Sequence, residues 1–289
     1  MVRLPRVRAP KTAVRAVTRS AILRTTPPIR RLVDRQRRTA AELTDVKRQN
    51  GRLRRRVARL TEENARLAAL VCDDSGLEYA FIVTYGRSGS TLLQGVLSAT
   101  PGVVMRGENN DALYQLFRFR ELVDARRRVQ LRVATRRQER SAWFGIEGYD
   151  ERIALRQMRQ LMLQTLIRPE PDSQIVGFKE VRYDKEDLVD YVRFMRAVFP
   201  GARIIINTRD HAAVSQSKWW GEQEDALENL AAFEGRLMDV LEDLGDAAYH
   251  VRYDDYVTDP GRLRGLFDWL GVDFDEDRVK DVLAVKHSF

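Results

Sequence analysis

The sequence contains few of the residues that build covalent cross-links or metal sites. Among its 289 residues there is one cysteine, Cys72, and there are three histidines, His211, His250 and His287. A single cysteine excludes an internal disulfide framework and is typical of a reducing compartment. So small a set of cysteine and histidine ligands argues against a zinc site, and we expect no bound metal.

Long hydrophobic runs are also missing. No apolar stretch reaches the roughly 18 residues that span a bilayer, and no signal-peptide core is visible. We therefore expect a cytoplasmic protein, with peripheral contact to a membrane surface left open.

The sequence has an excess of positive charge, with a formal net charge of +8. This balance favours anionic partners such as nucleotides, nucleic acid or anionic lipid.

Acidic residues are absent before Asp34, where arginines and four prolines accumulate. We expect residues 1–33 to form a disordered basic arm. Within it the stretch TAVRAVTRSAIL has the spacing of a weakly amphipathic helix, which could contact an anionic membrane surface. A transit peptide is an alternative interpretation of the same composition.

A heptad pattern in residues 34–72 predicts a coiled-coil helix. Leucine recurs at d positions, and Asn50 and Asn64 stand at a positions. An asparagine at heptad position a lowers the stability of a coiled coil, but it fixes the register of the helices and favours a parallel pair. We expect a parallel homodimer, with a single amphipathic helix packed on its own domain as the alternative. A DNA-binding basic zipper is a further interpretation. Pro27 and Pro28 interrupt any continuous basic helix, so we expect no nucleic acid as a partner.

The stretch from Tyr79 onward predicts an anion-binding loop. An apolar strand leads into GRSGST and then into an apolar-periodic helix. Unpaired N–H groups and the dipole at a helix start favour an anion there. The loop lacks the lysine of a Walker A motif. An ordinary strand-to-helix turn and a P-loop-like nucleotide kinase or ATPase are the alternatives. The candidate ligands of the anion are Arg87, Ser88, Gly89, Ser90 and Thr91.

Further apolar segments alternate with helical patterns through the rest of the chain. This alternation predicts a P-loop-like three-layer α/β/α sandwich with a mostly parallel central sheet. We assign residues 76–289 to this α/β domain. The other expected strands cover residues 103–105, 175–178, 203–207 and 248–253.

Polar side chains follow several of these strands, and ligands bind at the carboxyl ends of strands in open α/β sheets. Glu108 follows the second strand, Lys179 ends the third, and Arg209 follows the fourth. Ser217 comes eight residues after Arg209. Between the second and third strands, residues 111–145 predict an arginine-rich helix whose charges mostly face solvent.

From residue 79 the sequence resembles the sulfotransferases that use 3′-phosphoadenosine 5′-phosphosulfate (PAPS), especially the branch of bacterial carbohydrate-type and tyrosylprotein enzymes. Three motifs match in order: YGRSGSTLL, NTRDHAAVSQS and VRYDDYVTDPGRLRGLFDWLGV. The resemblance implies that residues 87–91 hold the 5′ side of PAPS and that Arg209 and Ser217 hold its 3′-phosphate. The third motif is implied to be structural.

The same resemblance implies roles around the sulfuryl group. Glu108 lies 21 residues after Arg87, close to the spacing of the catalytic base in the tyrosylprotein branch. Arg87 and Lys179 would stabilise the transferred group, so the reaction needs no metal. The expected function is transfer of a sulfuryl group from PAPS to a hydroxyl acceptor. A carbohydrate or glycolipid is the preferred acceptor, and a peptide is the alternative.

Overall fold

The computed structural model describes residues 27–71, 76–133 and 142–284. The chain forms two compact units, residues 1–70 and 71–289. No helix in the described ranges is long and apolar enough to cross a membrane.

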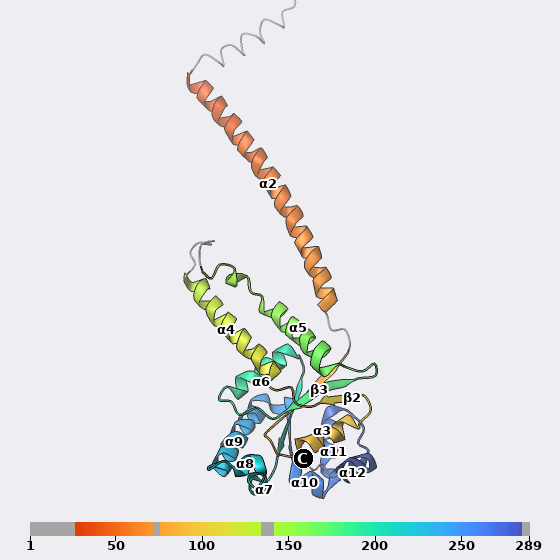
Figure 1. The fold of residues 1–289 in the computed structure, drawn as a ribbon. Coiled ribbons are helices and arrows are strands. Elements are labelled where there is room, and N and C mark those ends of the chain that lie inside the picture. The colour runs from red at the N-terminus through yellow and green to blue at the C-terminus, as the bar shows by residue number, and fades with distance from the viewer. Residues whose placement is uncertain (1–26, 72–75, 134–141, 285–289) are drawn as a thin grey trace, which may run out of the picture. The chain divides into compact units, whose positions relative to one another are not determined.

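The described part of the first unit is one long helix, α2 (Pro27–Val71) (Figure 1). Its first residues are Pro27 and Pro28, which suit a helix start because the first-turn N–H groups need no partner within the helix. The helix predicted over residues 34–72 is present, but it begins earlier, at Pro27, inside the predicted arm. Residues 1–26 of that arm lie outside the described residues.

The second unit is organised around a five-stranded sheet with the strand order β2-β3-β1-β4-β5. All four neighbouring pairs are parallel, so the carboxyl ends of all five strands lie along one edge. This confirms the predicted sheet, and every expected strand is present. The strands are β1 (Glu78–Thr84), β2 (Val103–Arg106), β3 (Ile175–Glu180), β4 (Arg203–Thr208) and β5 (Ala248–Arg252).

Strand β1 shows why the sheet is covered on both faces. Tyr79, Phe81 and Val83 point into one hydrophobic core, and Ala80 and Ile82 point into the other. Such continuous apolar strands are typical of a parallel sheet buried between helices. The sandwich therefore has the three predicted layers (Figure 1).

Different helices supply the two outer layers. The first core takes in α4 (Ala112–Val133), α5 (Glu151–Met162), α6 (Leu188–Val198) and α9 (Ala226–Leu244). The second takes in α3 (Ser90–Ser98), α10 (Tyr253–Thr258), α11 (Arg264–Leu270) and α12 (Glu276–Ala284).

Several connections differ in detail from the expected pattern. The predicted arginine-rich helix ends at Val133, residues 134–141 lie outside the described ranges, and Trp143 lies in a turn. Tyr253, expected as the last residue of the strand over 248–253, instead begins helix α10, with two aspartates in its first turn where the helix dipole favours negative charge. The remaining short helices are α7 (His211–Ser215), α8 (Lys218–Gly221), the 3-10 turns Ile146–Gly148, Gly245–Ala247 and Pro260–Leu263, and the π turn Leu163–Ile167.

Many arginines of α4 have local partners. Arg120 pairs with Glu151 at 2.8 Å and Arg128 with Asp124 at 2.7 Å. The guanidinium of Arg126 lies 3.8 Å from the centre of the Trp143 ring. These contacts account for much of the charge on the helix as ordinary surface pairing.

Candidate functional site

Residues 86–91, which we call the phosphate loop, connect β1 to α3. Arg87 and Gly89 adopt left-handed backbone conformations, with φ of 69° and 80°. Alternation of left-handed and right-handed residues turns successive N–H groups toward one side, which makes a concave anion site. Gly89 is the N-cap of α3 and offers no side-chain acceptor. The N–H groups of the first two helical residues, Ser90 and Thr91, therefore have no intrahelical acceptor, an arrangement that favours an anion at this end of the helix.

Two aromatic rings explain why this loop needs its glycines. A Cβ atom at Gly86 would lie 1.6 Å from the Trp219 ring, and one at Gly89 would lie 2.0 Å from the Tyr253 ring. The indole N–H of Trp220 donates to the carbonyl oxygen of Gly86 at 3.0 Å. Any side chain at either glycine would displace an aromatic residue, so the loop conformation is tied to both glycines.

Buried polar groups hold the phosphate loop from below. The Thr84 hydroxyl lies 2.5 Å from the Asn207 carbonyl oxygen and 2.7 Å from the Ser88 hydroxyl. The Asn207 amide donates to the Ser88 carbonyl oxygen at 2.9 Å, and the Tyr256 hydroxyl donates to Asn207 Oδ1 at 3.1 Å. Ser88 is fully buried. Its hydroxyl therefore stabilises the loop from inside, and an anion-binding role for Ser88 stays a prediction.

Ser90 and Thr91 lie in the first turn of α3, where Ser90 is buried and Thr91 is exposed. The first backbone bond of this turn runs from the Leu92 N–H to the Gly89 oxygen at 2.9 Å. Arg87 is exposed at the tip of the loop. These positions are compatible with the anion-binding roles predicted for all three residues.

Arg209 lies directly beside the phosphate loop. Its guanidinium donates to the Arg87 carbonyl oxygen at 3.1 Å and lies 4.4 Å from the centre of the Tyr253 ring. The Arg209 N–H donates to the Tyr85 hydroxyl at 2.9 Å, and burial raises the pKa of this phenol. The structure thus brings together two of the predicted PAPS contacts, Arg87 and Arg209.

Two predicted ligands of the 3′-phosphate carry buried polar atoms that make no hydrogen bond within the protein. These atoms are Nε of Arg209 and Oγ of Ser217. Ser217 also stands two residues before Trp219, whose ring covers Gly86. Buried donors normally have partners, so the roles predicted for Arg209 and Ser217 would account for two otherwise unpaired atoms.

Glu108 and Lys179 meet at the carboxyl ends of the neighbouring strands β2 and β3. Lys179 Nζ lies 2.6 Å from Glu108 Oε1. The Lys179 side chain is 5% exposed, whereas the Glu108 side chain is 38% exposed. The lysine is thus held inside, and the carboxylate remains within reach of solvent or of a bound molecule.

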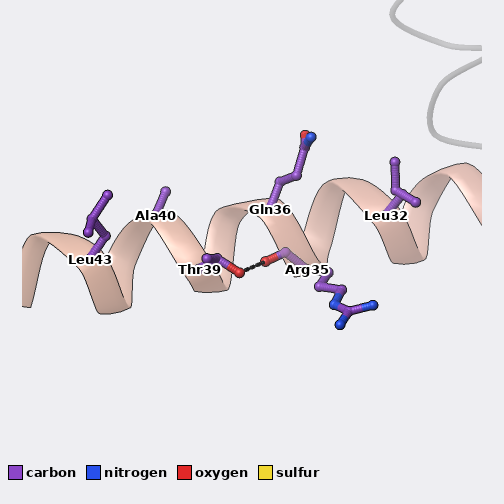
Figure 2. Close-up of a pocket in the computed structure, with 6 residues that line it drawn as sticks. All are labelled: Leu32, Arg35, Gln36, Thr39, Ala40 and Leu43. Atoms are coloured by element: carbon purple, nitrogen blue, oxygen red, sulfur yellow. Dashed lines mark hydrogen bonds between the residues drawn. The ribbon is translucent and has the colours of Figure 1, made fainter.

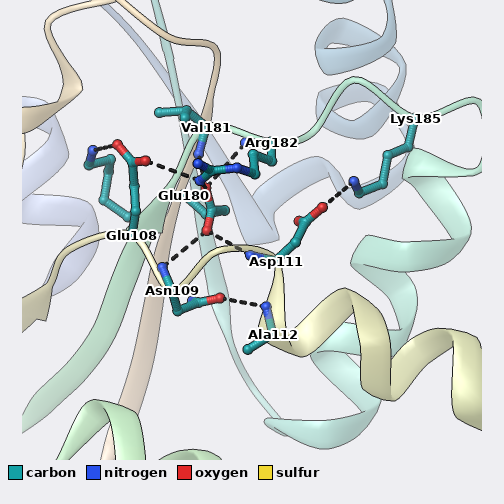
Figure 3. A network of polar contacts seen from close by, with 9 residues as sticks. Glu108, Asn109, Asp111, Ala112, Glu180, Val181, Arg182 and Lys185 are labelled. Atoms are coloured by element: carbon teal, nitrogen blue, oxygen red, sulfur yellow. Dashed lines mark hydrogen bonds and ion pairs between the residues drawn. The ribbon is translucent and has the colours of Figure 1, made fainter.

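Two residues that the sequence did not single out complete this group. Arg182 donates through one nitrogen to Glu108 at 3.2 Å and to Glu180 at 3.1 Å. Burial works to raise the pKa of Glu180, but N–H donors from the backbone outweigh it and hold the pKa below its usual value. We call Glu108, Lys179, Glu180 and Arg182 the carboxylate cluster. Figure 3 shows Glu108, Glu180 and Arg182 joined in one polar network.

A cleft of about 320 Å³ adjoins both the phosphate loop and the carboxylate cluster. Its wall combines aromatic rings with amide and charged side chains, and the Trp219 indole is 52% exposed. The lining residues are Gly86, Val181, Arg182, Asp184, Lys185, Trp219, Trp220, Gln223, Asn229 and Phe233.

The described histidines have structural contacts elsewhere. His211 lies 2.8 Å from Glu234, and His250 lies 2.8 Å from the Thr208 hydroxyl. Burial lowers the pKa of His250 and favours its neutral form. Within the described ranges no group of three or more histidine, cysteine or acidic residues is placed to hold a metal ion.

A family model described as the sulfotransferase family matches residues 80–276. This match covers the sheet, the phosphate loop and the carboxylate cluster. The chain belongs to the sulfotransferase family.

Solved structures resemble this chain at low identity. The sulfotransferase domain from the curacin biosynthetic pathway is 18% identical over 73% of this chain and 79% of its own, with a TM-score of 0.46. The sulfotransferase domain of the Synechococcus PCC 7002 olefin synthase is 22% identical over 73% of this chain and 78% of its own, also with a TM-score of 0.46. Sulfotransferase STF9 from Mycobacterium avium is 15% identical over 77% of this chain and 72% of its own, with a TM-score of 0.42. No curated protein matches the chain.

Proposed function

We propose that this protein transfers a sulfuryl group from PAPS to a hydroxyl group of an acceptor. The observation that carries the proposal is the contact between Lys179 and Glu108, 2.6 Å apart, at the sheet edge that also bears the phosphate loop. Sulfuryl transfer to a hydroxyl is helped by a carboxylate within reach of the attacking hydroxyl and by a cation near the charge of the transferred group, and this pair supplies both. The family match supports sulfuryl transfer in general.

The donor nucleotide fits the groups that surround the phosphate loop. The N–H groups of the loop and the start of α3 would hold its 5′ side, together with Arg87, Ser90 and Thr91. Arg209 and Ser217 would hold the 3′-phosphate through the two buried donor atoms that the protein leaves without a partner. PAPS supplies the sulfuryl group that is transferred.

The carboxylate cluster would act on the acceptor. Glu108 would take the proton of the attacking hydroxyl as general base, a role worth about 10²–10⁴ in rate. Its carboxylate lies 2.6 Å from Lys179 Nζ and 3.2 Å from the Arg182 guanidinium, and these contacts fix its position beside the acceptor. Lys179 and Arg87 would stabilise the charge of the sulfuryl group and of the leaving oxygen.

We assign the acceptor to the 320 Å³ cleft and favour a carbohydrate or the sugar head of a glycolipid. The exposed Trp219 ring offers a flat apolar surface, and Gln223 and Asn229 offer amide donors and acceptors for sugar hydroxyls. The cations Arg182 and Lys185 both have acidic partners, at 3.1 and 2.5 Å. This pairing favours a neutral acceptor over an acidic peptide.

Two measurements test the proposed function. A bound ligand stabilises the fold in proportion to its affinity, so PAP, the product left by PAPS, should raise the melting temperature more than ATP. Transfer of labelled sulfate from PAPS to candidate sugars should then identify the reaction. Mg²⁺-dependent ATP turnover without PAPS-dependent transfer would instead support the kinase or ATPase interpretation.

We further propose that two copies pair in parallel through α2. In that helix six seam side chains are about half to two-thirds exposed: Leu32, Leu43, Val46, Leu53, Val57 and Leu60. Figure 2 shows Leu32, Gln36 and Leu43 projecting from the same side of the helix. Glu42 and Lys47 occupy the g and following e positions, which attract each other across a parallel pair.

Light scattering tests the pairing. The intact chain should have the mass of a dimer, and replacement of Leu53 and Leu60 by aspartate should give a monomer. A mass of one chain for the intact protein would favour the alternative in which α2 packs on its own domain.

A further inference from the structure

The turn that follows Glu108 has an unfavourable backbone conformation. Asn110 and Asp111 are consecutive non-glycine residues in the left-handed region, with φ of 57° and 64°. Asparagine and aspartate adopt this conformation more readily than other L-residues, but two in succession still cost free energy that surrounding contacts must offset. Since Glu108 stands two residues before Asn110, whatever imposes this turn also sets the position of the proposed base.

The buried carboxylate of Glu180 lies under this turn (Figure 3). One oxygen of Glu180 accepts the backbone N–H groups of Asn109 and Asp111, each at 3.1 Å. Its other oxygen accepts the N–H groups of Val181 at 2.8 Å and Arg182 at 3.3 Å. These bonds fasten the backbone of the turn after β2 to the end of β3, and the ion pair between Asp111 and Lys185 at 2.5 Å adds a side-chain connection.

Arg182 adds a second connection from Glu180 to the base. The same guanidinium nitrogen donates to Glu180 at 3.1 Å and to Glu108 at 3.2 Å. Glu180 therefore binds the backbone that follows Glu108, and it also binds Arg182, one of the two cations that contact the Glu108 carboxylate. Glu180 is 1% exposed and its oxygens are occupied by these donors, so it cannot itself reach an acceptor.

From this geometry we infer that Glu180 is the positioning residue for Glu108. It holds the left-handed turn at Asn110 and Asp111 and, through Arg182, fixes the direction in which the Glu108 carboxylate points. The inference rests on the proposed function, because it assumes that Glu108 is the base. A carboxylate is required at this position, since a glutamine would place an amide N–H₂ against one of the two pairs of backbone N–H donors.

Glu180→Gln tests the inference, with Glu186→Gln, an exposed residue of the following segment, as the matched control. Three quantities are measured in each variant: kcat for sulfuryl transfer, PAP affinity by calorimetry, and hydrogen exchange of the Asn109 and Asp111 amides. We expect kcat to fall about 10- to 100-fold in Glu180→Gln, because small misplacement of a catalytic group costs this much. PAP affinity should stay within about twofold of the wild type, because the phosphate loop keeps its own supports.

Hydrogen exchange separates the inference from the proposed function. The Asn109 and Asp111 amides should exchange at least about tenfold faster in Glu180→Gln than in the wild type, whatever reaction the protein catalyses. If the wild type transfers no sulfate from PAPS, the proposed function fails, and the exchange rates alone decide whether Glu180 holds the turn. Unchanged exchange, or unchanged kcat in an active enzyme, would overturn the inference.

A second variant covers the case in which Glu180→Gln does not fold. Arg182→Ala removes the guanidinium that joins Glu180 to Glu108, and because this side chain also lines the 320 Å³ cleft, KM for the acceptor is measured beside kcat. It should lower kcat about three- to tenfold and leave PAP affinity unchanged, since one of the two connections is lost. A folding failure of Glu180→Gln together with wild-type kinetics in Arg182→Ala would refute the positioning role.

Discussion

The phosphate loop and the carboxylate cluster differ in how much of their bonding capacity the protein itself uses. Around the phosphate loop, Arg209 Nε and Ser217 Oγ have no partner within the protein, and the first turn of α3 has no side-chain cap. In the carboxylate cluster, by contrast, Glu108 and Glu180 are held by Lys179, Arg182 and the backbone.

This difference indicates how each end of the site meets a ligand. The phosphate loop is supported by buried contacts, and beside it Arg209 Nε and Ser217 Oγ make no internal hydrogen bond that a ligand would have to replace. Lys179 already pairs with Glu108, so it must exchange or share this partner in order to contact a sulfuryl group. Binding of the donor would therefore change the surroundings of the base, whereas loss of the base should leave donor binding intact.

Removal of Glu108 should show the largest difference between the carboxylate cluster and the phosphate loop, because it should affect turnover and not PAP binding. We expect Glu108→Ala to lower kcat about 10²- to 10⁴-fold, the usual contribution of a general base. PAP affinity should change less than about twofold, because Glu108 has no contact with the phosphate loop groups that we propose to hold PAP. Radiolabel transfer and calorimetry on the same preparation measure both quantities, with Glu186→Ala as the control. Full turnover in Glu108→Ala would exclude the residue as base.

The opposite pattern is expected for Arg209→Ala. Loss of a charged donor to a phosphate corresponds to about 1.5–3 kcal/mol, so PAP affinity should fall about 10- to 150-fold. At saturating PAPS, kcat should fall less than affinity does. Arg262→Ala, which removes an arginine that is 71% exposed, provides the control. Equal affinity in Arg209→Ala and the wild type would remove the residue from the phosphate site.

Ser217→Ala should give a smaller change of the same kind. A neutral hydrogen bond contributes about 0.5–1.5 kcal/mol, so PAP affinity should fall about two- to tenfold. The melting temperature of the ligand-free protein should not fall, because the Ser217 hydroxyl has no partner there. Ser215, whose hydroxyl donates to the Ala212 oxygen at 3.0 Å, gives a matched serine-to-alanine control. A drop in ligand-free stability for Ser217→Ala would contradict an open donor.

The carboxylate cluster should also show a pH signature of its own, the smallest of these effects. The folded-state pKa of Glu180 is lowered below that of an unfolded glutamate, about 4.3. The ionised side chain therefore stabilises the fold above the unfolded pKa, and this contribution is lost as the pH falls through the folded pKa. The difference in unfolding free energy between the wild type and Glu180→Gln should be largest near neutral pH and should shrink below about pH 4. Denaturant titrations across this range measure it, and a pH-independent difference would contradict the assignment.

Much of this fold could be predicted from the sequence because its signals are local. The apolar run at Tyr79 to Val83 predicts a buried strand, and the glycine-containing turn after it predicts the anion site. Glu108 and Lys179 were expected at one sheet edge, and their strands proved to be neighbours. When strands alternate with helices and run parallel, residues that follow the strands lie along the same edge of the sheet.

The supports of the site could not be predicted, because they join residues far apart in the chain. Asn207 contacts Ser88 across 119 positions, and Glu180 contacts the Asn109 N–H across 71. The inward direction of the Ser88 hydroxyl follows from the left-handed backbone at Arg87 and Gly89, which the residue types alone do not specify. A glutamate after an apolar strand gives no sign that its partners will be backbone N–H groups of another loop.

The two tryptophans at Gly86 give the phosphate loop an optical reporter. Trp219 lies against this glycine and is about half exposed, and Trp220 donates its indole N–H to the glycine carbonyl oxygen. The chain has four tryptophans, so half of its indole rings lie beside one glycine. A nucleotide that settles into the loop should change the emission of both rings, and a simple fluorescence titration could then follow binding in the absence of any acceptor.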